Sequence, residues 1–312
     1  MYFCKKYTSM TLIIDCGSTK SEWVLLNGDA VVSRFVSNGF NPNFCDAKMI
    51  SENIEQSLEN IDNQYVKRIV FYGSGCGSQT NQAKIREIFE KFLNNTKIEV
   101  YPDTLGACHA LFGKNPGVAC ILGTGSNACV YDGEKITGSV ASLGFMIGDE
   151  GSGCHIGKRI VHDYFLGLMP DVLRAKFDEK YYLDRDAFLK RVYQGEQPSR
   201  YLAEFAKFAS ENIDNQYIRN VVGGCFEEFL LSFRPTVGSG EISFKHGSYS
   251  IDGDFSIPLR SSRNDKIGFV GSIAFAFQDI LLQVIENHNL KCSKILKNPM
   301  DGLIDFYKES ER

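Results

Sequence analysis

One pattern occurs twice in this 312-residue chain and constrains its fold more than any other feature. Residues 11–15 form a short apolar run, a turn of Gly, Ser and Thr follows, and two more apolar runs come after it. The same succession restarts at residue 117. Short apolar runs bounded by turn residues predict β-strands. The sequence therefore predicts an internal repeat, with two α/β halves that each open with three antiparallel strands.

Strand and helix patterns alternate after each of these openings. The apolar periodicity predicts further strands at 67–72, 98–101 and 267–270, and helices at 46–58, 79–93, 103–112 and 272–287. Residues 151–233 are mostly helical in pattern. A polar stretch, 235–265, shows weak strand alternation, and its role is not evident from its composition. We expect a domain boundary near residues 114–116, which contain a proline.

Composition excludes several classes of function. Hydrophobic residues make up 43% of the chain and charged residues 23%, as in ordinary globular proteins. The formal net charge of -4 gives no electrostatic reason to expect a nucleic acid or an anionic membrane as partner. The sequence has no apolar window of about 20 residues, the length that a membrane-spanning helix needs. We therefore expect neither a nucleic acid nor a membrane as partner.

The ten cysteines point to a reducing compartment. None stands in a Cys-x-x-Cys pair, which argues against a zinc ribbon or a redox motif. Many lie within apolar runs and are interpreted as small buried hydrophobic residues. Free thiols in this number, without a signal peptide pattern at the N-terminus, favour a cytoplasmic location.

The two Gly/Ser/Thr turns are candidate phosphate sites. In the first, Asp15 ends an apolar strand and the turn Gly17-Ser18-Thr19-Lys20 follows. Such a turn offers backbone N–H groups and hydroxyls to an anion, and the carboxylate can hold magnesium through water. It lacks the Walker spacing, and the alternative is a plain hairpin. The turn Gly123-Thr124-Gly125-Ser126-Asn127 repeats this Gly/Ser/Thr pattern in the second half of the chain. Two such hairpins favour a nucleotide held between them.

Asp103 and Asp149 are the candidate acidic residues of the site. Asp103 follows a strand and opens a helix, where it is either a helix cap or a general base for a hydroxyl nucleophile. Asp149 and Glu150 precede a long helix, where they either favour the helix dipole or accept hydrogen bonds from sugar hydroxyls. Asn41 and Asn127 are further candidates for sugar contacts.

Two other glycine-containing segments have structural alternatives. Gly271 and Ser272 lie between a strand and a helix, where the absent side chain would admit a flat ring or would simply permit close packing. The segment Gly73 to Gly77 departs from the spacing of a dinucleotide-binding loop and is interpreted as a sharp strand-to-helix turn.

Six blocks in order resemble the N-acetylglucosamine kinase branch of the actin-like ATPases, the group that includes the BadF/BadG/BcrA/BcrD ATPases. They are Ile14 to Lys20, Phe40 to Pro42, Asp103 to Ala107, Leu122 to Asn127, Gly148 to Gly153 and Val270 to Ala274. The resemblance implies an α/β fold of two ribonuclease-H-like domains around a central nucleotide and sugar cleft. The implied domains are 1–114, joined by the tail 295–312, and 115–294.

The resemblance also implies roles for individual residues. Asp15 would lie near Mg²⁺, and the catalytic base would be Asp103. ATP would be held by the two turns and by the adenosine segment, that is by Gly17, Ser18, Thr19, Lys20, Gly123, Thr124, Gly125, Gly271 and Ser272. The amino sugar would be held by Asn41, Ser126, Asn127, Asp149 and Glu150.

The implied activity is transfer of the ATP γ-phosphoryl group to the 6-hydroxyl of an amino sugar, with N-acetylglucosamine as the expected substrate. A homodimer is the oligomeric state that the resemblance suggests. Two alternatives stay open at this point. One is an activator ATPase of a 2-hydroxyacyl-CoA dehydratase, which would carry a [4Fe–4S] cluster. The other is a sugar sensor without catalytic activity.

Overall fold

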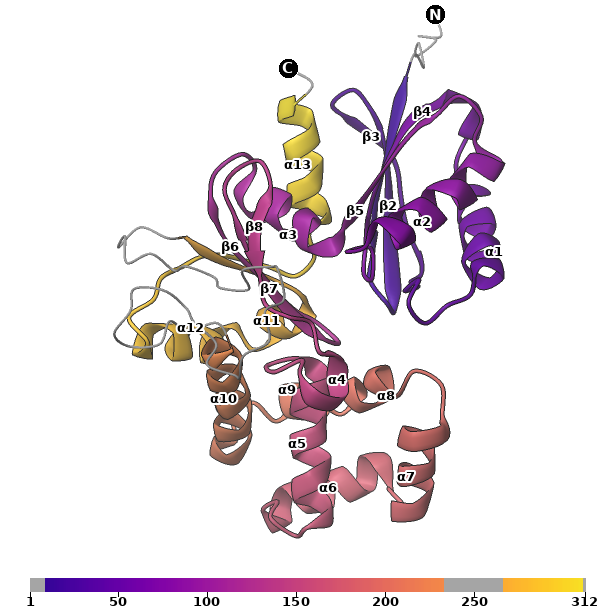
Figure 1. Cartoon of the computed structure of the whole chain (residues 1–312). Helices are drawn as coiled ribbons and strands as arrows, with labels where there is room; N and C mark the ends of the chain where they lie inside the picture. The colour runs from indigo at the N-terminus through magenta and orange to yellow at the C-terminus, as the bar shows by residue number, and fades with distance from the viewer. Residues whose placement is uncertain (1–8, 233–265, 311–312) are drawn as a thin grey trace, which may run out of the picture. The chain divides into compact units, whose positions relative to one another are not determined.

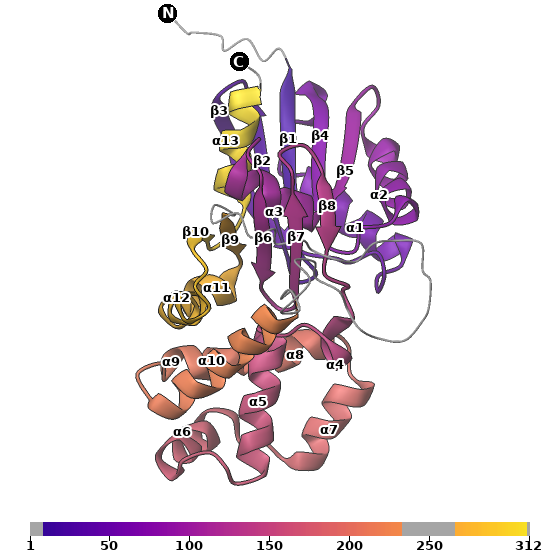
Figure 2. The ribbon, with the colours of Figure 1, turned by 60° about the vertical axis from the view of Figure 1, so that its left-hand side comes forward.

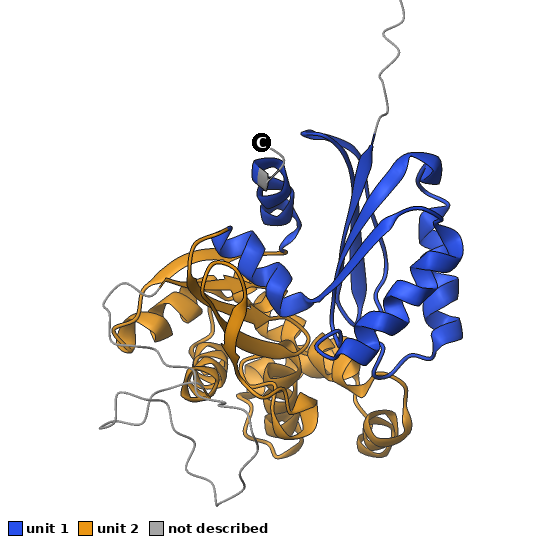
Figure 3. Cartoon of the chain, turned by 45° about the horizontal axis from the view of Figure 1, so that its top comes forward, with its two compact units in different colours: residues 1–113, 299–312 blue, residues 114–298 orange. Residues whose placement is uncertain are grey.

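The computed structural model describes residues 9–232 and 266–310, and these divide into two compact units. Unit 1 comprises residues 1–113 and 299–312, and unit 2 comprises residues 114–298 (Figure 3). The polar stretch 235–265 lies outside the described residues.

Unit 1 is built on a five-stranded mixed sheet. Its strands are β1 (Met10–Cys16), β2 (Lys20–Asn27), β3 (Ala30–Asn38), β4 (Val66–Gly73) and β5 (Lys97–Pro102). The order across the sheet is β3-β2-β1-β4-β5. The first three strands pair antiparallel, as the sequence predicts, whereas β4 and β5 run parallel to β1. The carboxyl ends of β1, β4 and β5 therefore meet at one edge of the sheet.

Helices cover both faces of this sheet (Figure 1). They are α1 (Ala47–Leu58), the short 3-10 helix Asn63–Tyr65, α2 (Gln79–Phe92), α3 (Asp103–Phe112) and α13 (Met300–Ser310). α1 and α2 lie on one face, and α3 and α13 lie on the other. Apolar side chains of α1 and α2 close the core against the buried rings of Trp23 and Phe71, with Phe89 of α2 in contact with both rings.

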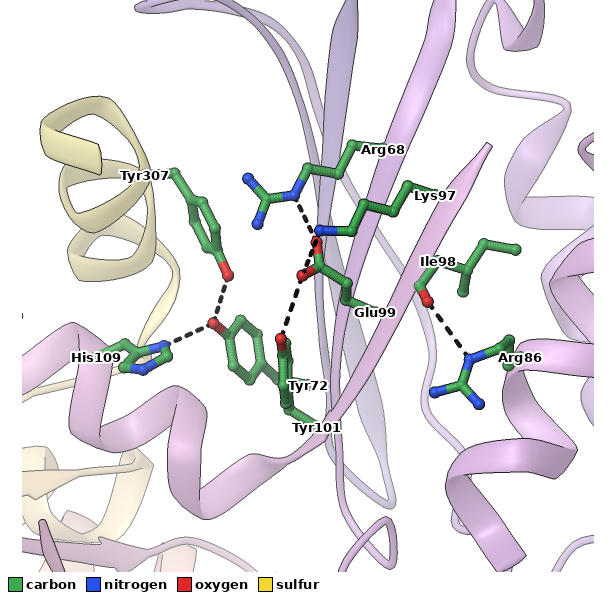
Figure 4. Close-up of polar contacts among 9 residues, drawn as sticks. All are labelled: Arg68, Tyr72, Arg86, Lys97, Ile98, Glu99, Tyr101, His109 and Tyr307. Atoms are coloured by element: carbon green, nitrogen blue, oxygen red, sulfur yellow. Dashed lines mark hydrogen bonds and ion pairs between the residues drawn. The ribbon is translucent and has the colours of Figure 1, made fainter. Parts of the chain in front are cut away.

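A polar cluster fastens α13, the last helix of the chain, to unit 1 (Figure 4). Tyr72 of β4 lies between His109 of α3 and Tyr307 of α13. The guanidinium of Arg68 lies 5.1 Å from the ring centre of Tyr307 and forms an ion pair with Glu99 of β5. These contacts join the C-terminal helix to two strands of the sheet and to α3.

Unit 2 repeats the sheet of unit 1. Its strands are β6 (Gly117–Leu122), β7 (Ser126–Tyr131), β8 (Ile136–Ser139), β9 (Ile267–Val270) and β10 (Cys292–Leu296). The order β10-β9-β6-β7-β8 has the same connectivity, with three antiparallel strands first and two parallel strands after them. The repeat predicted from the sequence is thus confirmed at the level of topology.

The helices of unit 2 fall mostly between β8 and β9. Those described are α4 (Gly144–Ile147), α5 (Gly153–Phe165), α6 (Asp171–Tyr181), α7 (Arg185–Gln194), α8 (Pro198–Glu204), α9 (Ala206–Glu211), α10 (Gln216–Leu231), α11 (Ser272–Ala276) and α12 (Gln278–Asn287). α5 to α9 gather beyond one end of the sheet (Figure 2). Their core is aromatic: Phe177, Phe205 and Phe208 are fully buried, and the Phe177 ring contacts both of the others.

The observed elements differ from the expected ones in a few places. The helix expected at 272–287 is divided at Phe277, whose backbone leaves the helical region (φ -115°, ψ 27°). Strand β10 and helix α4 were not anticipated. Asp103 is the first residue of α3 rather than its cap, because the capping position is Pro102. Among residues 9–232 and 266–310, every helix is too short or too polar to cross a membrane.

Candidate functional site

The turn between β1 and β2 in unit 1 is a closed hairpin. The N–H of Gly17 donates to the carbonyl of Lys20 at 3.0 Å, and the N–H of Gly39 donates to the carbonyl of Thr19 at 3.1 Å. Ser18 and Lys20 are exposed. The backbone of this turn is fixed, and it presents a hydroxyl and an ammonium group to solvent, as binding of a phosphate requires.

Asp15 is partly buried near the end of β1, directly opposite Glu22 in the antiparallel pair. Burial and the nearby charges of Asp103 and Glu22 raise the pKa of Asp15 to about 7, and Lys20 opposes this shift. A hard cation would relieve this excess of negative charge. Mg²⁺ commonly binds through one or two carboxylates plus waters and phosphate oxygens. Asp15 fits that role as a single carboxylate beside a turn that offers a hydroxyl and an ammonium group to a phosphate.

Asp103 follows β5 at the same edge of the sheet and starts α3. Its Oδ1 accepts a hydrogen bond from the N–H of Thr104 at 2.9 Å. Burial raises the pKa of Asp103, while hydrogen bonding, that from the Thr104 N–H first, opposes the shift. A partly buried carboxylate held by a fixed backbone donor is suited to accept a proton from a hydroxyl placed beside it.

Asn41 joins the same group of side chains. Its Nδ2 lies 3.4 Å from the Oγ of Ser18 and 3.4 Å from the Oγ of Ser74. Its Oδ1 accepts from the N–H of Asn43 at 3.0 Å. Unit 1 therefore places Asn41 and Ser18 beside Ser74, a residue that the sequence analysis interprets as part of a structural turn. Its position after β4, between strand β1, which carries Asp15, and strand β5, which Asp103 follows, is the signal that could have identified it.

The second turn, in unit 2, is fastened to the start of α5. The carbonyl of Gly123 accepts from the N–H of Gly153 at 2.8 Å, and that of Thr124 accepts from the N–H of Cys154 at 3.1 Å. Gly123 also closes the hairpin by donating to Gly125 at 3.0 Å. The turn and the α5 N-terminus thus form one rigid piece of backbone.

Asp149 connects this turn to the predicted sugar residues of unit 2. Its Oδ1 accepts from the N–H of Ser126 at 3.1 Å, and burial raises its pKa. The residue has a left-handed backbone (φ 58°). Together with Glu150, Ser126 and Asn127, it lines one pocket, whose walls also include Ala128, Val140, Ala141, Ser142, Leu143, Phe229 and Ser232.

Gly271 lies against the second turn, as a nucleotide site built from both segments would require. A Cβ at Gly271 would lie 2.1 Å from the carbonyl oxygen of Leu122 and 3.2 Å from the nitrogen of Gly123. Its φ of 134° also disfavours any other residue. Ser272 starts α11 directly after it. The structure thus brings Gly271 and Ser272 to the Gly123–Gly125 turn within unit 2. Of the five predicted sugar residues, Asn41 belongs to unit 1 and the other four belong to unit 2.

Comparisons with known proteins identify the fold and the family of this chain. Two five-stranded mixed sheets of this topology define the two-lobed fold of the actin-like ATPases and sugar kinases. Residues 14–213 match the BadF/BadG/BcrA/BcrD ATPase family, and the chain belongs to that family. A search of curated proteins gives no match.

Solved structures extend the comparison over nearly the whole chain. A candidate N-acetylglucosamine kinase from Porphyromonas gingivalis is 30% identical, with a TM-score of 0.85, and the match covers 97% of this chain and 100% of that one. One from Chromobacterium violaceum shares the fold at 14% identity and a TM-score of 0.69, covering 96% and 99%. A ROK family transcriptional regulator, homologous to the E. coli MLC protein, shares it at 13% identity and a TM-score of 0.51, covering 96% and 78%.

Proposed function

We propose that this protein is an ATP-dependent sugar kinase that phosphorylates the 6-hydroxyl of an amino sugar, with N-acetylglucosamine as the substrate. Membership of an ATPase family supports the use of ATP. The 30% identity to the Porphyromonas gingivalis protein over almost the full length of both chains supports the sugar kinase assignment. The finer choice of N-acetylglucosamine rests on that relative's description and on the six sequence blocks.

The observation that carries the proposal is the constellation at the edge of the unit 1 sheet. Asp15, near the end of β1, and Asp103, directly after β5, lie at the same edge of one sheet on either side of β4, and the charge of Asp103 contributes to the raised pKa of Asp15. Both are partly buried, and the turn with Ser18 and Lys20 lies beside Asp15. One carboxylate suits a cation and the other suits proton transfer, which are the two acidic functions that phosphoryl transfer to an alcohol needs.

The roles of the side chains follow from their chemistry. Asp103 would orient the sugar hydroxyl and accept its proton as the oxygen bonds to the γ-phosphorus and the bond to the ADP oxygen breaks. Asp15 would hold Mg²⁺, which offsets phosphate charge when bound. Ser18, Thr19 and Lys20, with Gly123, Thr124 and Gly125, would hold the phosphates. Asn41 and the pocket residues Ser126, Asn127, Asp149 and Glu150 would hold the sugar.

A coupled ADP-release assay tests the proposal. Magnesium-ATP is supplied with N-acetylglucosamine, glucosamine, N-acetylmuramic acid, N-acetylmannosamine or glucose in turn. ADP release that depends on N-acetylglucosamine, with sugar 6-phosphate as product, is the expected result. Release that depends on another sugar would retain the kinase and change the substrate.

Two other outcomes would replace the proposal. Slow ATP hydrolysis that no sugar stimulates, together with protein-bound iron, would favour the activator of a 2-hydroxyacyl-CoA dehydratase. Sugar binding without ATP turnover would favour a sensor. Iron analysis and calorimetric titration with each sugar distinguish these cases.

A further inference from the structure

Residues 149–151 of unit 2 form a turn, hereafter the pocket turn, whose backbone needs support. Asp149 and Gly151 both have left-handed conformations, with φ of 58° and 71°. A residue other than glycine in this region persists only where its surroundings hold it. A Cβ at Gly151 would lie 2.8 Å from the Cβ of Phe229, so the turn is also closely packed. Because Asp149 and Glu150 line the pocket, the support of this turn decides how they are presented.

A buried histidine accepts the hydrogen bond that the pocket turn donates. The buried N–H of Gly151 donates to the Nδ1 of His155 at 3.1 Å. His155 lies in the first turn of α5, and its own N–H donates to the Oγ of the capping residue Ser152 at 3.1 Å. A buried backbone N–H needs an acceptor, and here the imidazole ring supplies it. His155 is therefore coupled to the pocket through the backbone of Gly151.

This hydrogen bond determines which nitrogen of the ring carries the proton. A ring nitrogen that accepts a hydrogen bond has no proton, so a neutral imidazole has its proton on the other nitrogen. In His155 that nitrogen is Nε2, which lies 3.5 Å from the Oε2 of Glu228 on α10. A ring protonated on both nitrogens would direct an N–H at the N–H of Gly151, and the hydrogen bond would be lost.

The charges around His155 have both signs. The carboxylates of Glu228 and Glu150 favour a protonated ring. The side chains of Lys158 and Arg159, both on α5, disfavour it. Burial is the largest influence, and it lowers the pKa of His155 from its ordinary value of 6.5. The ring is therefore neutral at neutral pH, when its Nδ1 can accept, and it becomes protonated only below pH 6.5.

Resting on the proposed function, we infer that His155 is a positioning residue: its neutral ring holds the Gly151 N–H and so fixes the pocket turn for binding of the sugar. The N–H of Ser126 donates to the Oδ1 of Asp149 at 3.1 Å, so a second pocket residue depends on the same turn. Loss of the Nδ1 acceptor would let the pocket turn shift and weaken sugar binding. The proposed base, Asp103, belongs to unit 1 and keeps its own hydrogen bond. The expected effect is therefore on KM for the sugar and not on kcat.

The test compares His155→Asn, His155→Leu and the control His162→Asn. The Asn amide places an oxygen near the position of Nδ1 and does not titrate, whereas Leu fills the space without an acceptor. His162 is an exposed histidine of the same helix and lies against Asp163. At about pH 8, we expect His155→Leu to raise KM for the sugar by about 3- to 10-fold, the value of one hydrogen bond. His155→Asn and His162→Asn should keep the parent's KM at this pH.

The dependence on pH separates the role of the ring from simple packing. As pH falls below 6.5, KM for the sugar should rise more in the parent and in His162→Asn than in His155→Asn, whose acceptor is permanent. A loss of folded protein would instead lower kcat and leave KM unchanged. The inference is overturned if His155→Leu keeps the parent's KM, if its only change is a kcat that falls in step with the thermal midpoint, or if the parent and His155→Asn share one pH profile.

The inference can fail separately from the proposed function. A parent protein that phosphorylates none of the sugars refutes the function, and NMR then decides the inference without a substrate. Two-bond proton–nitrogen spectra of histidine-labelled protein should show the Nδ1 of His155 without a proton at about pH 8. His155→Asn identifies its signal among those of the five histidines. The Gly151 amide should exchange with solvent slowly in the parent and faster in His155→Leu. A proton on Nδ1, or equal exchange in the two proteins, would remove His155 from the positioning role.

Discussion

The hydroxyl oxygens of Tyr72 and Tyr307 lie 2.6 Å apart, although 235 positions separate the two residues in sequence. Tyr72 is the last residue but one of β4, two positions before Ser74, and Tyr307 lies on the C-terminal helix. The Tyr72 hydroxyl also lies 2.7 Å from the Nδ1 of His109, six residues along α3 from Asp103. The contact thus ties the end of the chain to the strand and the helix that carry the proposed site.

Tyr307→Phe should destabilise the protein while leaving the ring packing intact. Loss of one buried hydrogen bond costs about 1 kcal/mol in free energy of unfolding. Tyr307→Ala should cost several times more, since it also removes a buried ring. Urea unfolding measures both. Tyr182→Phe is the matched control, because Tyr182 is 91% exposed and should be neutral. Equal stability of Tyr307→Phe and the parent would show that the contact contributes nothing.

His109 should make stability depend on pH in the acidic range. Burial lowers the pKa of His109 from 6.5 to about 4, so the folded protein binds fewer protons there than the unfolded chain. The contribution of neutral His109 to the free energy of unfolding is therefore complete above pH 6.5 and is lost as pH falls from 6.5 toward 4. His109→Gln cannot titrate, and its free energy of unfolding should fall less over this range. Identical pH slopes for variant and parent would contradict the lowered pKa.

The sheets were predictable because their signal is local. Residues 11–15 and 117–122 are apolar runs bounded by turns, and β1 and β6 form there. Strand β10 is not predictable from the sequence because it is a poorly buried edge strand. Ser293 and Lys294 are exposed, and the five-residue segment has little apolar periodicity. The division at Phe277 likewise depends on packing, which periodicity does not encode.

The site was predictable only in part, for a related reason. Asp103 and Asn41 stand in recognisable blocks, and the structure places Asn41 3.4 Å from the Ser74 hydroxyl and Asp103 after the strand that pairs with β4. Ser74 itself stands in a Gly-Ser-Gly turn whose composition suggests a simple connection. Its significance depends on β4 lying between β1 and β5, and these strands pair residues at least 29 positions apart in sequence. Local pattern could not supply that neighbourhood.

Asp103→Asn should abolish most turnover with little change in ATP affinity. Asparagine keeps the size of the side chain but cannot accept the hydroxyl proton, and general base catalysis contributes about 10²- to 10⁴-fold in rate. Asp279→Asn is the control, since Asp279 is an exposed acid in the first turn of α12, as Asp103 is in α3. Steady-state kinetics and an ATP-dependent thermal shift provide the two readouts. Turnover near that of the parent would exclude Asp103 as the base.

Asp15 should make magnesium binding depend on pH. With its pKa raised to about 7, the folded protein holds a proton that the unfolded chain releases near pH 4, so its contribution to stability decreases as pH rises through 7. A metal must displace that proton. Stabilisation by magnesium-ATP should therefore be greater at about pH 8 than at about pH 6, and Asp15→Asn should lose this difference.

The control for this experiment is Asp62→Asn, which alters an exposed carboxylate in the same unit. It should retain the pH-dependent stabilisation of the parent. Thermal shifts measured with and without magnesium separate the metal from the nucleotide. If Asp15→Asn keeps the full effect, the cation is held elsewhere.

Two glycine substitutions in unit 2 should have effects of opposite sign. Gly271→Ala places a Cβ 2.1 Å from the Leu122 carbonyl at a φ of 134°, so the backbone must move, and we expect a loss of several kcal/mol in stability. Gly224→Ala introduces a Cβ within α10 with nothing inside 4 Å, and should stabilise the helix by about 0.5–1 kcal/mol. Urea unfolding measures the stability of both variants. ATP-dependent thermal shifts report whether the proposed nucleotide binding by the Gly123–Gly125 turn is affected. A Gly271→Ala protein as stable as the parent would show that β9 and the Gly123–Gly125 turn are less closely packed than described, and would weaken the assignment of Gly271 to the nucleotide site.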